Sequence, residues 1–193
     1  MPRSDNLYAL PDDLPVPTDD GACAHLPGMR LPAIPLRSTA GGLVSLADID
    51  APWLITYFYP RTGLPDADPP GGLAAWDAIP GTRGCTPQSC AYCDHHDQLS
   101  AQGARVFGIS SQDTAYQAEA AARLHLPYEL LSDAGLELAH ALGLPTFTIA
   151  SHTMIKRLTL IARRGIIEQC FYPVFPPTAD AANVLEYLHG RDV

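Results

Sequence analysis

The chain has 193 residues, 47% of them hydrophobic, and a formal net charge of −9 at pH 7, which fits a globular protein large enough to bury a core. The negative charge argues against nucleic acid, whose phosphates need a basic surface, and against an anionic membrane. No apolar run reaches the length of a membrane span, so we expect neither kind of partner.

Residues 1–36 are rich in Pro and Asp, which predicts an extended N-terminal wrap over the surface of a single domain formed by residues 1–193. This stretch lacks the continuous apolar segment of a signal peptide. We therefore expect a cytoplasmic protein, in which stable structural disulfides are unusual. The five cysteines are an odd number, so they cannot all pair within one chain.

Hydrophobic patterning and turn residues predict strands alternating with helices, followed by a hairpin and a final helix. The pattern indicates an α/β fold with a mixed β-sheet flanked by helices. The expected elements, in chain order, are a short strand or turn within residues 41–50, a buried strand at Trp53–Tyr59, a long Pro/Gly-rich loop at residues 61–84, a helix from about Thr86 to Leu99, a strand at Ala104–Ser110, a helix from about Thr114 to Leu124, a short strand within residues 126–133, a short helix within residues 135–143, a hairpin over Ile155–Tyr172 that turns at Arg163–Gly165, and a closing helix within residues 178–190.

The stretch "GCTPQSCAYCDHH", from Gly84 to His96, concentrates three cysteines and two histidines. Thr82 or Thr86 is a candidate N-cap for the helix that follows, and either cap places Cys85 within about one turn of the helix N-terminus. Unpaired backbone N–H groups and the helix dipole favour a thiolate there. Cys85 therefore has the position of a nucleophile.

Cys90 follows Cys85 by five residues, so in a continuous helix their Cα atoms would lie roughly 8–9 Å apart. That distance exceeds the limit of about 7 Å for a disulfide without backbone movement. Pro87 lies between them and lacks an N–H. This turn therefore has one backbone hydrogen bond fewer to break when it opens. The spacing indicates a switchable bond rather than a permanent one.

Cys90 and Cys93 form a C-x-x-C pair, a spacing shared by dithiol oxidoreductases and metal sites. A zinc site would use Cys85, Cys90 and Cys93 with His95 or His96. On one helix, however, Cys85 and Cys93 would be about 12 Å apart, and the sequence has no second ligand pair. We therefore expect no metal.

The other cysteines and charged side chains near this motif have ordinary structural explanations. Cys23 and Cys170 are expected to be buried bystanders that pack as small apolar residues. His95, His96 and Arg83 are expected to be solvated.

Thr82-Arg83-Gly84-Cys85 matches T-x-x-C, and Cys90 lies five residues beyond Cys85. With Pro60 at the end of a strand and Arg157 in "IKRLTLI", these residues resemble the P-x-x-x-T-x-x-C signature of the peroxiredoxins, in particular the Q-type (bacterioferritin-comigratory-protein) branch. The resemblance covers about residues 31–188. It implies a thioredoxin-like fold, here with an N-terminal extension and a long insertion between Pro60 and Thr82.

The resemblance also implies a thiol peroxidase that reduces hydrogen peroxide and organic hydroperoxides. Cys85 would become a sulfenic acid, Cys90 would resolve it as an intramolecular disulfide, and a thioredoxin-like dithiol protein would recycle it. Arg157 would hold the thiolate and polarise the peroxide, while the Thr82 hydroxyl orients both. Pro60 and Cys93 are auxiliary candidates. The family needs no cofactor and occurs as monomers or weak homodimers.

Two alternatives stay open. The first is a thioredoxin-like disulfide reductase that uses Cys90 and Cys93, and the second is a zinc-binding or redox-sensing module without turnover. Disulfide mapping after peroxide treatment separates the first alternative from the peroxidase, and zinc analysis separates the second.

Overall fold

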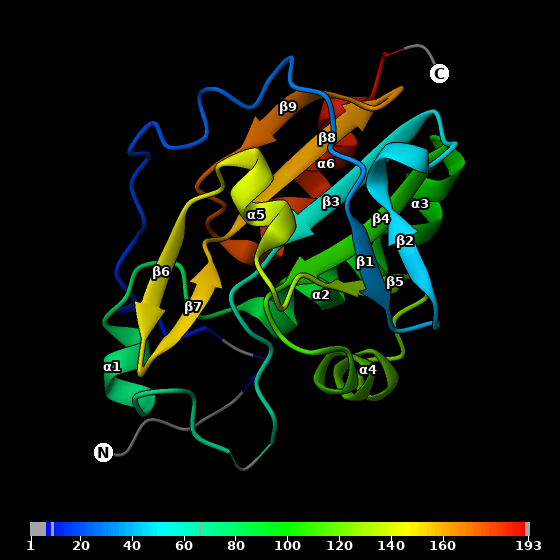
Figure 1. Ribbon diagram of the computed structural model, residues 1–193. Coiled ribbons are helices and arrows are strands. Elements are labelled where there is room, and N and C mark those ends of the chain that lie inside the picture. Colours follow the sequence, from blue (N-terminus) through cyan, green and yellow to red (C-terminus); the bar gives the residue numbers. More distant parts are fainter. Residues whose placement is uncertain (1–6, 9, 66, 192–193) are drawn as a thin grey trace.

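The computed structural model describes residues 7–8, 10–65 and 67–191 (Figure 1). The strands are β1 (Pro35–Ser38), β2 (Leu43–Ser45), β3 (Trp53–Phe58), β4 (Ala104–Ser110), β5 (Glu129–Ser132), β6 (Thr146–Ile149), β7 (His152–Ile155), β8 (Leu158–Arg163) and β9 (Ile166–Phe171). The helices are α1 (Leu73–Asp77), α2 (Cys85–Asp94), α3 (His96–Ala101), α4 (Thr114–Arg123), α5 (Glu137–Leu142) and α6 (Asp180–Leu188), with short 3-10 turns at Leu46–Asp48 and Pro177–Ala179.

Seven strands form one mixed sheet in the order β2-β1-β5-β4-β3-β8-β9. The central strands β3, β4 and β5 are parallel, whereas β8 runs antiparallel to β3 and β1 antiparallel to β5. This arrangement confirms the predicted α/β fold with a mixed sheet. A separate hairpin of β6 and β7 lies beside it (Figure 1).

The sheet separates two hydrophobic cores, and β3 contributes to both because its side chains alternate between the faces. Leu54 and Phe58 belong to the core that α5 and the N-terminal segment cover, whereas Trp53, Ile55 and Tyr57 belong to the core formed with α2, α3 and α6. All six residues of β3 are buried. Cys85, the first residue of α2, belongs to the second core together with Trp53, Ile55 and Tyr57 of β3.

The predicted helix from Thr86 to Leu99 is two helices in the structure. The helix begins one residue earlier, at Cys85, and α2 ends at Asp94 before α3 starts at His96. The break occurs at His95, whose φ of −100° and ψ of 4° leave the helical region. Neither Gly nor Pro marks this break in the sequence.

The strands β1, β6 and β7 and the helix α1 were not predicted. α1 forms inside the expected loop at residues 61–84, and β6 with β7 forms a hairpin before the predicted one. Ile155 consequently belongs to β7, and the second hairpin consists of β8 and β9. Its turn at Arg164 and Gly165 is the one expected.

The N-terminal segment runs along the outer edge of β9 before it enters β1 (Figure 1). The N–H of Gly28 donates to the carbonyl of Ile167 at 2.7 Å, and the N–H of Leu31 donates to that of Gly165 at 2.9 Å. Earlier in the segment, Asp20 forms a 3.2 Å ion pair with Lys156. The segment is thus docked by backbone and side-chain contacts together.

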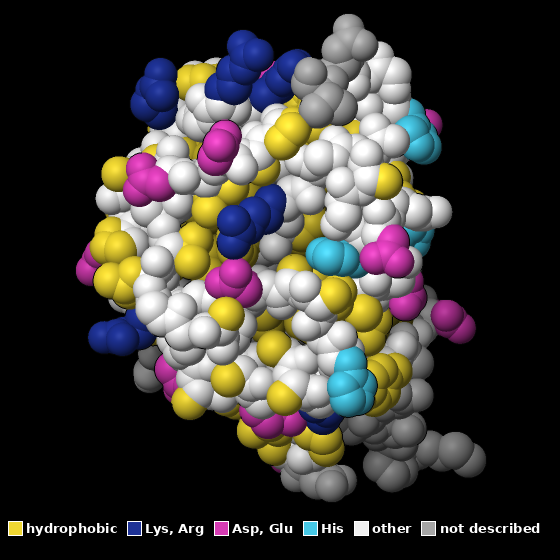
Figure 2. Space-filling model, turned by 90° about the vertical axis from the view of Figure 1, so that its right-hand side faces the viewer, with side chains coloured by type: hydrophobic (Ala, Val, Ile, Leu, Met, Phe, Trp, Pro, Cys, Tyr) yellow, Lys and Arg dark blue, Asp and Glu magenta, His cyan; other side chains and the backbone are white. Residues whose placement is uncertain are grey.

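None of the helices in the described part of the chain is both long and apolar enough to cross a membrane. Acidic and basic side chains are interspersed over the face shown in Figure 2.

Candidate active site

Cys85 is the first residue of α2 and is buried, with 3% of its surface exposed. The N-cap is Gly84, in a left-handed conformation with φ of 98°, and no side chain caps this helix. A Cβ at Gly84 would lie 2.3 Å from Pro177 Cγ, so glycine is required for both space and conformation. The expectation that Thr82 or Thr86 caps the helix is therefore wrong, although the position of Cys85 at its N-terminus is as predicted.

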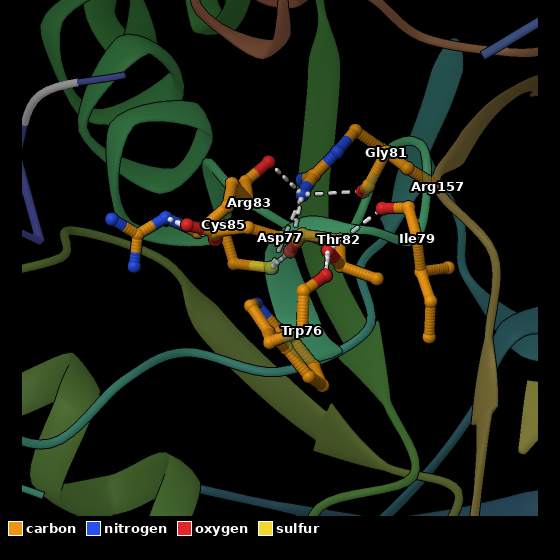
Figure 3. Close-up of polar contacts among 8 residues, drawn as sticks. All are labelled: Trp76, Asp77, Ile79, Gly81, Thr82, Arg83, Cys85 and Arg157. Carbon is orange, nitrogen blue, oxygen red and sulfur yellow. Dashed lines mark hydrogen bonds and ion pairs between the residues drawn. The ribbon is translucent and has the colours of Figure 1, made fainter. Parts of the chain in front are cut away.

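Arg157 points its guanidinium at the Cys85 sulfur (Figure 3). Its Nη2 lies 3.2 Å from Cys85 Sγ and donates to the carbonyls of Arg83 at 2.9 Å and Gly81 at 3.2 Å. Arg157 is only 3% exposed and precedes β8 rather than lying on a strand as expected. The carbonyls of the turn before α2 hold the cation on the sulfur.

A second donor reaches the same sulfur from the end of β3. The backbone N–H of Arg61 donates to Cys85 Sγ at 3.4 Å. Pro60 is buried and immediately precedes it. Pro60 thus lies beside the thiol despite the long insertion that separates it from Thr82 in the sequence.

The Thr82 side chain is buried against the inserted segment (Figure 3). Its hydroxyl lies 2.6 Å from the carbonyl of Trp76 and 2.9 Å from that of Ile79, and it donates to them. The carbonyl of Thr82 lies 3.6 Å from Cys85 Sγ. Because one hydroxyl has a single proton and two acceptor lone pairs, the Thr82 oxygen retains the capacity to accept a hydrogen bond.

Arg83 pairs with Asp77 of α1 at 3.2 Å, and the two side chains are only 9% and 4% exposed. The expectation that Arg83 is solvated is therefore wrong. Its partner comes from the insertion, whose helix was not predicted. The insertion thus supplies the carboxylate that compensates the extra cation beside Cys85.

Behind Arg157 lies a buried polar chain that sequence reasoning missed. Arg157 Nη1 donates to Gln88 Oε1, and Gln88 Nε2 donates to Asp180 Oδ2 at 2.8 Å. The hydroxyls of Thr159 and Tyr92 donate to the same carboxyl oxygen at 2.7 and 2.9 Å. Burial raises the pKa of Asp180, although these hydrogen bonds oppose the shift. No spacing rule singles out a glutamine on α2 or an aspartate at the start of α6.

A pocket opens onto Cys85 and Thr82. The insertion supplies apolar lining residues that include Leu64 and Trp76. Arg61 and Tyr116 also line the pocket. The Arg61 guanidinium lies over the Tyr116 ring, 4.3 Å from its centroid. The thiol is therefore reached through a small, partly apolar entrance with a cation at its wall.

Cys90 and Cys93 lie on α2, half-buried and with no cation bonded to either sulfur in the described part of the chain. Burial, followed by the charge of Asp94, raises the pKa of each thiol. Cys93 Sγ lies 3.9 Å from the carbonyl of His125. Among these three cysteines, Cys85 alone has a guanidinium and a backbone N–H within hydrogen-bond distance of its sulfur.

The two histidines of the motif are partly exposed, and each also has a partner within the protein. His95 Nδ1 lies 2.9 Å from the carbonyl of Ala91, and the His96 ring stacks on Tyr128 with centroids 5.9 Å apart. Within the described ranges, no three or more His, Cys, Asp or Glu side chains are placed to hold a metal ion.

The family model described as Redoxin matches residues 26–188. The chain belongs to the redoxin family. Its curated relatives include the chloroplastic peroxiredoxin Q of Oryza sativa subsp. japonica, 28% identical over 164 residues, and that of Gentiana triflora, 27% identical over 190 residues. The matches cover 84% and 95% of this chain and 66% and 78% of those proteins. The predicted resemblance to Q-type peroxiredoxins is thereby confirmed.

Solved structures show the same fold. Peroxidoxin BcpB from Mycobacterium tuberculosis has a TM-score of 0.70 at 22% identity, covering 86% of this chain and 98% of that one. Peroxiredoxin Q from Xanthomonas campestris has a TM-score of 0.63 at 20% identity, covering 91% and 96%. The thioredoxin-like fold predicted for this redoxin is confirmed.

Proposed function

We propose that this redoxin is a thiol peroxidase that reduces hydrogen peroxide and organic hydroperoxides through Cys85. The observation that carries the proposal is the pair of donors on one buried sulfur: Arg157 Nη2 at 3.2 Å and the Arg61 N–H at 3.4 Å. Both can stabilise negative charge on the sulfur and on an adjacent peroxide oxygen. The relatives named peroxiredoxin Q support the same activity.

In the first step the Cys85 thiolate attacks the terminal oxygen of the peroxide, the O–O bond breaks, and water or an alcohol leaves. Arg157 polarises the breaking bond, since its guanidinium is already at the sulfur. The Thr82 oxygen accepts a hydrogen bond from the peroxide O–H, because its own proton is used on the carbonyls of Trp76 and Ile79. The step leaves Cys85 as a sulfenic acid.

In the second step Cys90 attacks the sulfenic sulfur, water leaves, and a Cys85–Cys90 disulfide forms. Both residues lie in α2, so its first turn must open for the sulfurs to meet. Opening also removes Cys90 from the burial that raises the pKa of its thiol. A thioredoxin-like dithiol protein then reduces the disulfide and completes the cycle.

The disulfide reductase alternative requires Cys90 or Cys93 as the attacking thiolate. The raised pKa of both thiols disfavours that role, and the Arg157 guanidinium is at Cys85 instead. The comparisons also favour the peroxidase. The plant relatives are named as chloroplastic, so a cytoplasmic location stays a prediction, as does a monomer or weak homodimer.

The decisive experiment treats the reduced protein with one equivalent of hydrogen peroxide and maps its disulfides by mass spectrometry. The proposal expects Cys85–Cys90 as the main product and turnover with a thioredoxin system. Cys85→Ser should abolish peroxide consumption, Cys90→Ser should stop turnover after one equivalent, and Cys93→Ser should retain most activity. A main product of Cys90–Cys93, with Cys85 still a free thiol, would show that the proposal is wrong.

A further inference from the structure

Two cysteines outside the active site pack against the same hydrophobic core. Cys23, in the N-terminal segment, is 5% exposed and packs in the core that this segment covers. Cys170, in β9, packs against the same core and is half-buried. Cys23 is the largest cause of the raised pKa of the Cys170 thiol, so the two side chains lie close enough to interact. They are therefore not the unrelated bystanders that the sequence indicated.

The surrounding structure holds these two thiols together from both sides. The N-terminal segment pairs with β9 through the hydrogen bond between Gly28 and Ile167, and an isolated bridge joins Arg30 to Ile166. On the other side of Cys23, Asp20 is ion-paired with Lys156. The contacts that dock the N-terminal segment on β9 thus also keep Cys23 near Cys170.

One member of the pair lies at a surface pocket. Cys170 lines a surface pocket together with Tyr172 and Val174, whereas Cys85 opens into a different pocket. The interaction with Cys23, and then burial, raises the pKa of the Cys170 thiol. A raised pKa disfavours the Cys170 thiolate, so we expect oxidation of this pair to require excess peroxide.

We propose that Cys23 and Cys170 form a second dithiol centre, which closes to a disulfide under excess peroxide and covalently fastens the N-terminal segment to β9. The Cys23 sulfur attacks the peroxide, the O–O bond breaks, and water or an alcohol leaves. The second thiol then attacks the resulting sulfenic acid, the S–S bond forms, and a second product, water, leaves. Two thiols and one hydroperoxide thus give one disulfide, one alcohol or water, and one further water.

The disulfide would secure a segment that packs against the turn before α2. The Pro17 side chain lies against Gly81, whose carbonyl accepts a hydrogen bond from Arg157. A pocket between the N-terminal segment and this turn is lined by Pro17 and Asp20 on one side and by Gly81 and Arg157 on the other. Fastening Cys23 restrains this segment and protects the folded site while peroxide is abundant.

The test uses the full chain with Cys85, Cys90 and Cys93 all replaced by Ser, so that only the proposed pair remains. Excess hydrogen peroxide should abolish alkylation of both remaining thiols, and dithiothreitol should restore it. The Tm should rise by roughly 5–10 °C, because the bond closes a long loop of the unfolded chain. The same variant with Cys170→Ser as well is the matched control, and it should show neither change.

The wild-type chain provides a second measurement that does not depend on the folding of this variant. Peptide mapping after excess peroxide should find Cys23 joined to Cys170 in addition to any disulfide of the active site. Recovery of both residues as alkylated thiols, of Cys170 as a sulfinic acid, or of either residue joined to another cysteine would overturn the proposal. Since the triple variant lacks Cys85, its result is independent of the peroxidase function.

Discussion

The backbone N–H of Arg61 points at the sulfur of Cys85 from a distance of 3.4 Å. The contact brings the end of β3 to the start of α2, across an insertion that separates these residues by more than twenty positions in the sequence. Pro60 immediately precedes this donor. The insertion leaves this part of the site intact.

Arg61→Pro should lower the second-order rate of Cys85 oxidation by about 100-fold, because it removes a donor that stabilises charge at the reacting atoms. Arg61→Ala is the matched control, since it retains the N–H and loses only the side chain. Stopped-flow measurements with hydrogen peroxide give both rates, and circular dichroism establishes that each variant is folded. Equal rates for the two variants would contradict a role for this donor.

Arg157→Lys should reduce the same rate by about 100-fold as well. A lysine retains the charge but lacks the planar fork that reaches Gln88, Cys85 and the preceding turn together. Arg164→Lys, at an exposed turn position, is the control and should react at the wild-type rate. A wild-type rate for Arg157→Lys would mean that charge alone suffices.

Asp77→Asn should lower the free energy of unfolding by about 3 kcal/mol, because it leaves the buried Arg83 guanidinium without its carboxylate. Urea denaturation measures the loss. The double variant Asp77→Asn/Arg83→Met should recover part of it, since no buried cation remains. Additive losses in the double variant would show that the pair is not coupled.

Asp180→Asn should change how stability depends on pH. Burial raises the pKa of Asp180 above its ordinary value of 3.8, so the folded protein retains this proton at a pH where the unfolded chain has lost it. The contribution of Asp180 to stability therefore falls as pH rises from about 3.8 through the folded-state pKa. Asparagine cannot titrate, and the variant should gain stability relative to wild type over this window. Denaturant titrations between pH 4 and 8 measure both proteins. If the stabilities of the variant and the wild type changed with pH in the same way, Asp180 would not have a raised pKa in the folded protein.

Tyr128→Phe should accelerate Cys85–Cys90 disulfide formation by about fivefold while costing about 1 kcal/mol of stability. The Tyr128 hydroxyl donates to the carbonyl of Ser89 at 2.8 Å and so ties the middle of α2 to the sheet side of the core. Its loss makes opening of the helix easier. Tyr187→Phe is the control, and the rate of disulfide formation after a peroxide pulse is the measurement. An unchanged or slower rate would show that opening of this part of α2 does not limit disulfide formation.

The sequence was informative where backbone conformation depended on residues with strong local preferences. Gly165, with φ of 75°, forms the turn between β8 and β9 next to Arg164, and a glycine in that place predicted the hairpin. The turn between β6 and β7 uses Ala150 and Ser151 at φ of 46° and 65°. Neither residue type signals a left-handed conformation, so this hairpin was missed.

The residues of the candidate site were likewise predicted only in part. Cys85 was found from its expected place at a helix N-terminus, whereas Arg157 was found only through the resemblance to the peroxiredoxins. The burial of Arg83 could not be found, since it depends on a partner in α1, a five-residue helix among prolines and glycines. The chain through Gln88 and Asp180 likewise joins residues 92 positions apart, and only the fold brings them together.

The dependence of Thr82 and Arg83 on α1 constrains how this protein can diverge from its relatives. Thr82 donates its hydroxyl proton to a carbonyl of α1, and Arg83 is neutralised by an aspartate of α1. Deleting the insertion would remove this carboxylate from the Arg83 guanidinium, and an arginine acquired before the aspartate would lack the same ion pair. Homologues that lack this helix should therefore lack the arginine, and the two features should be inherited together.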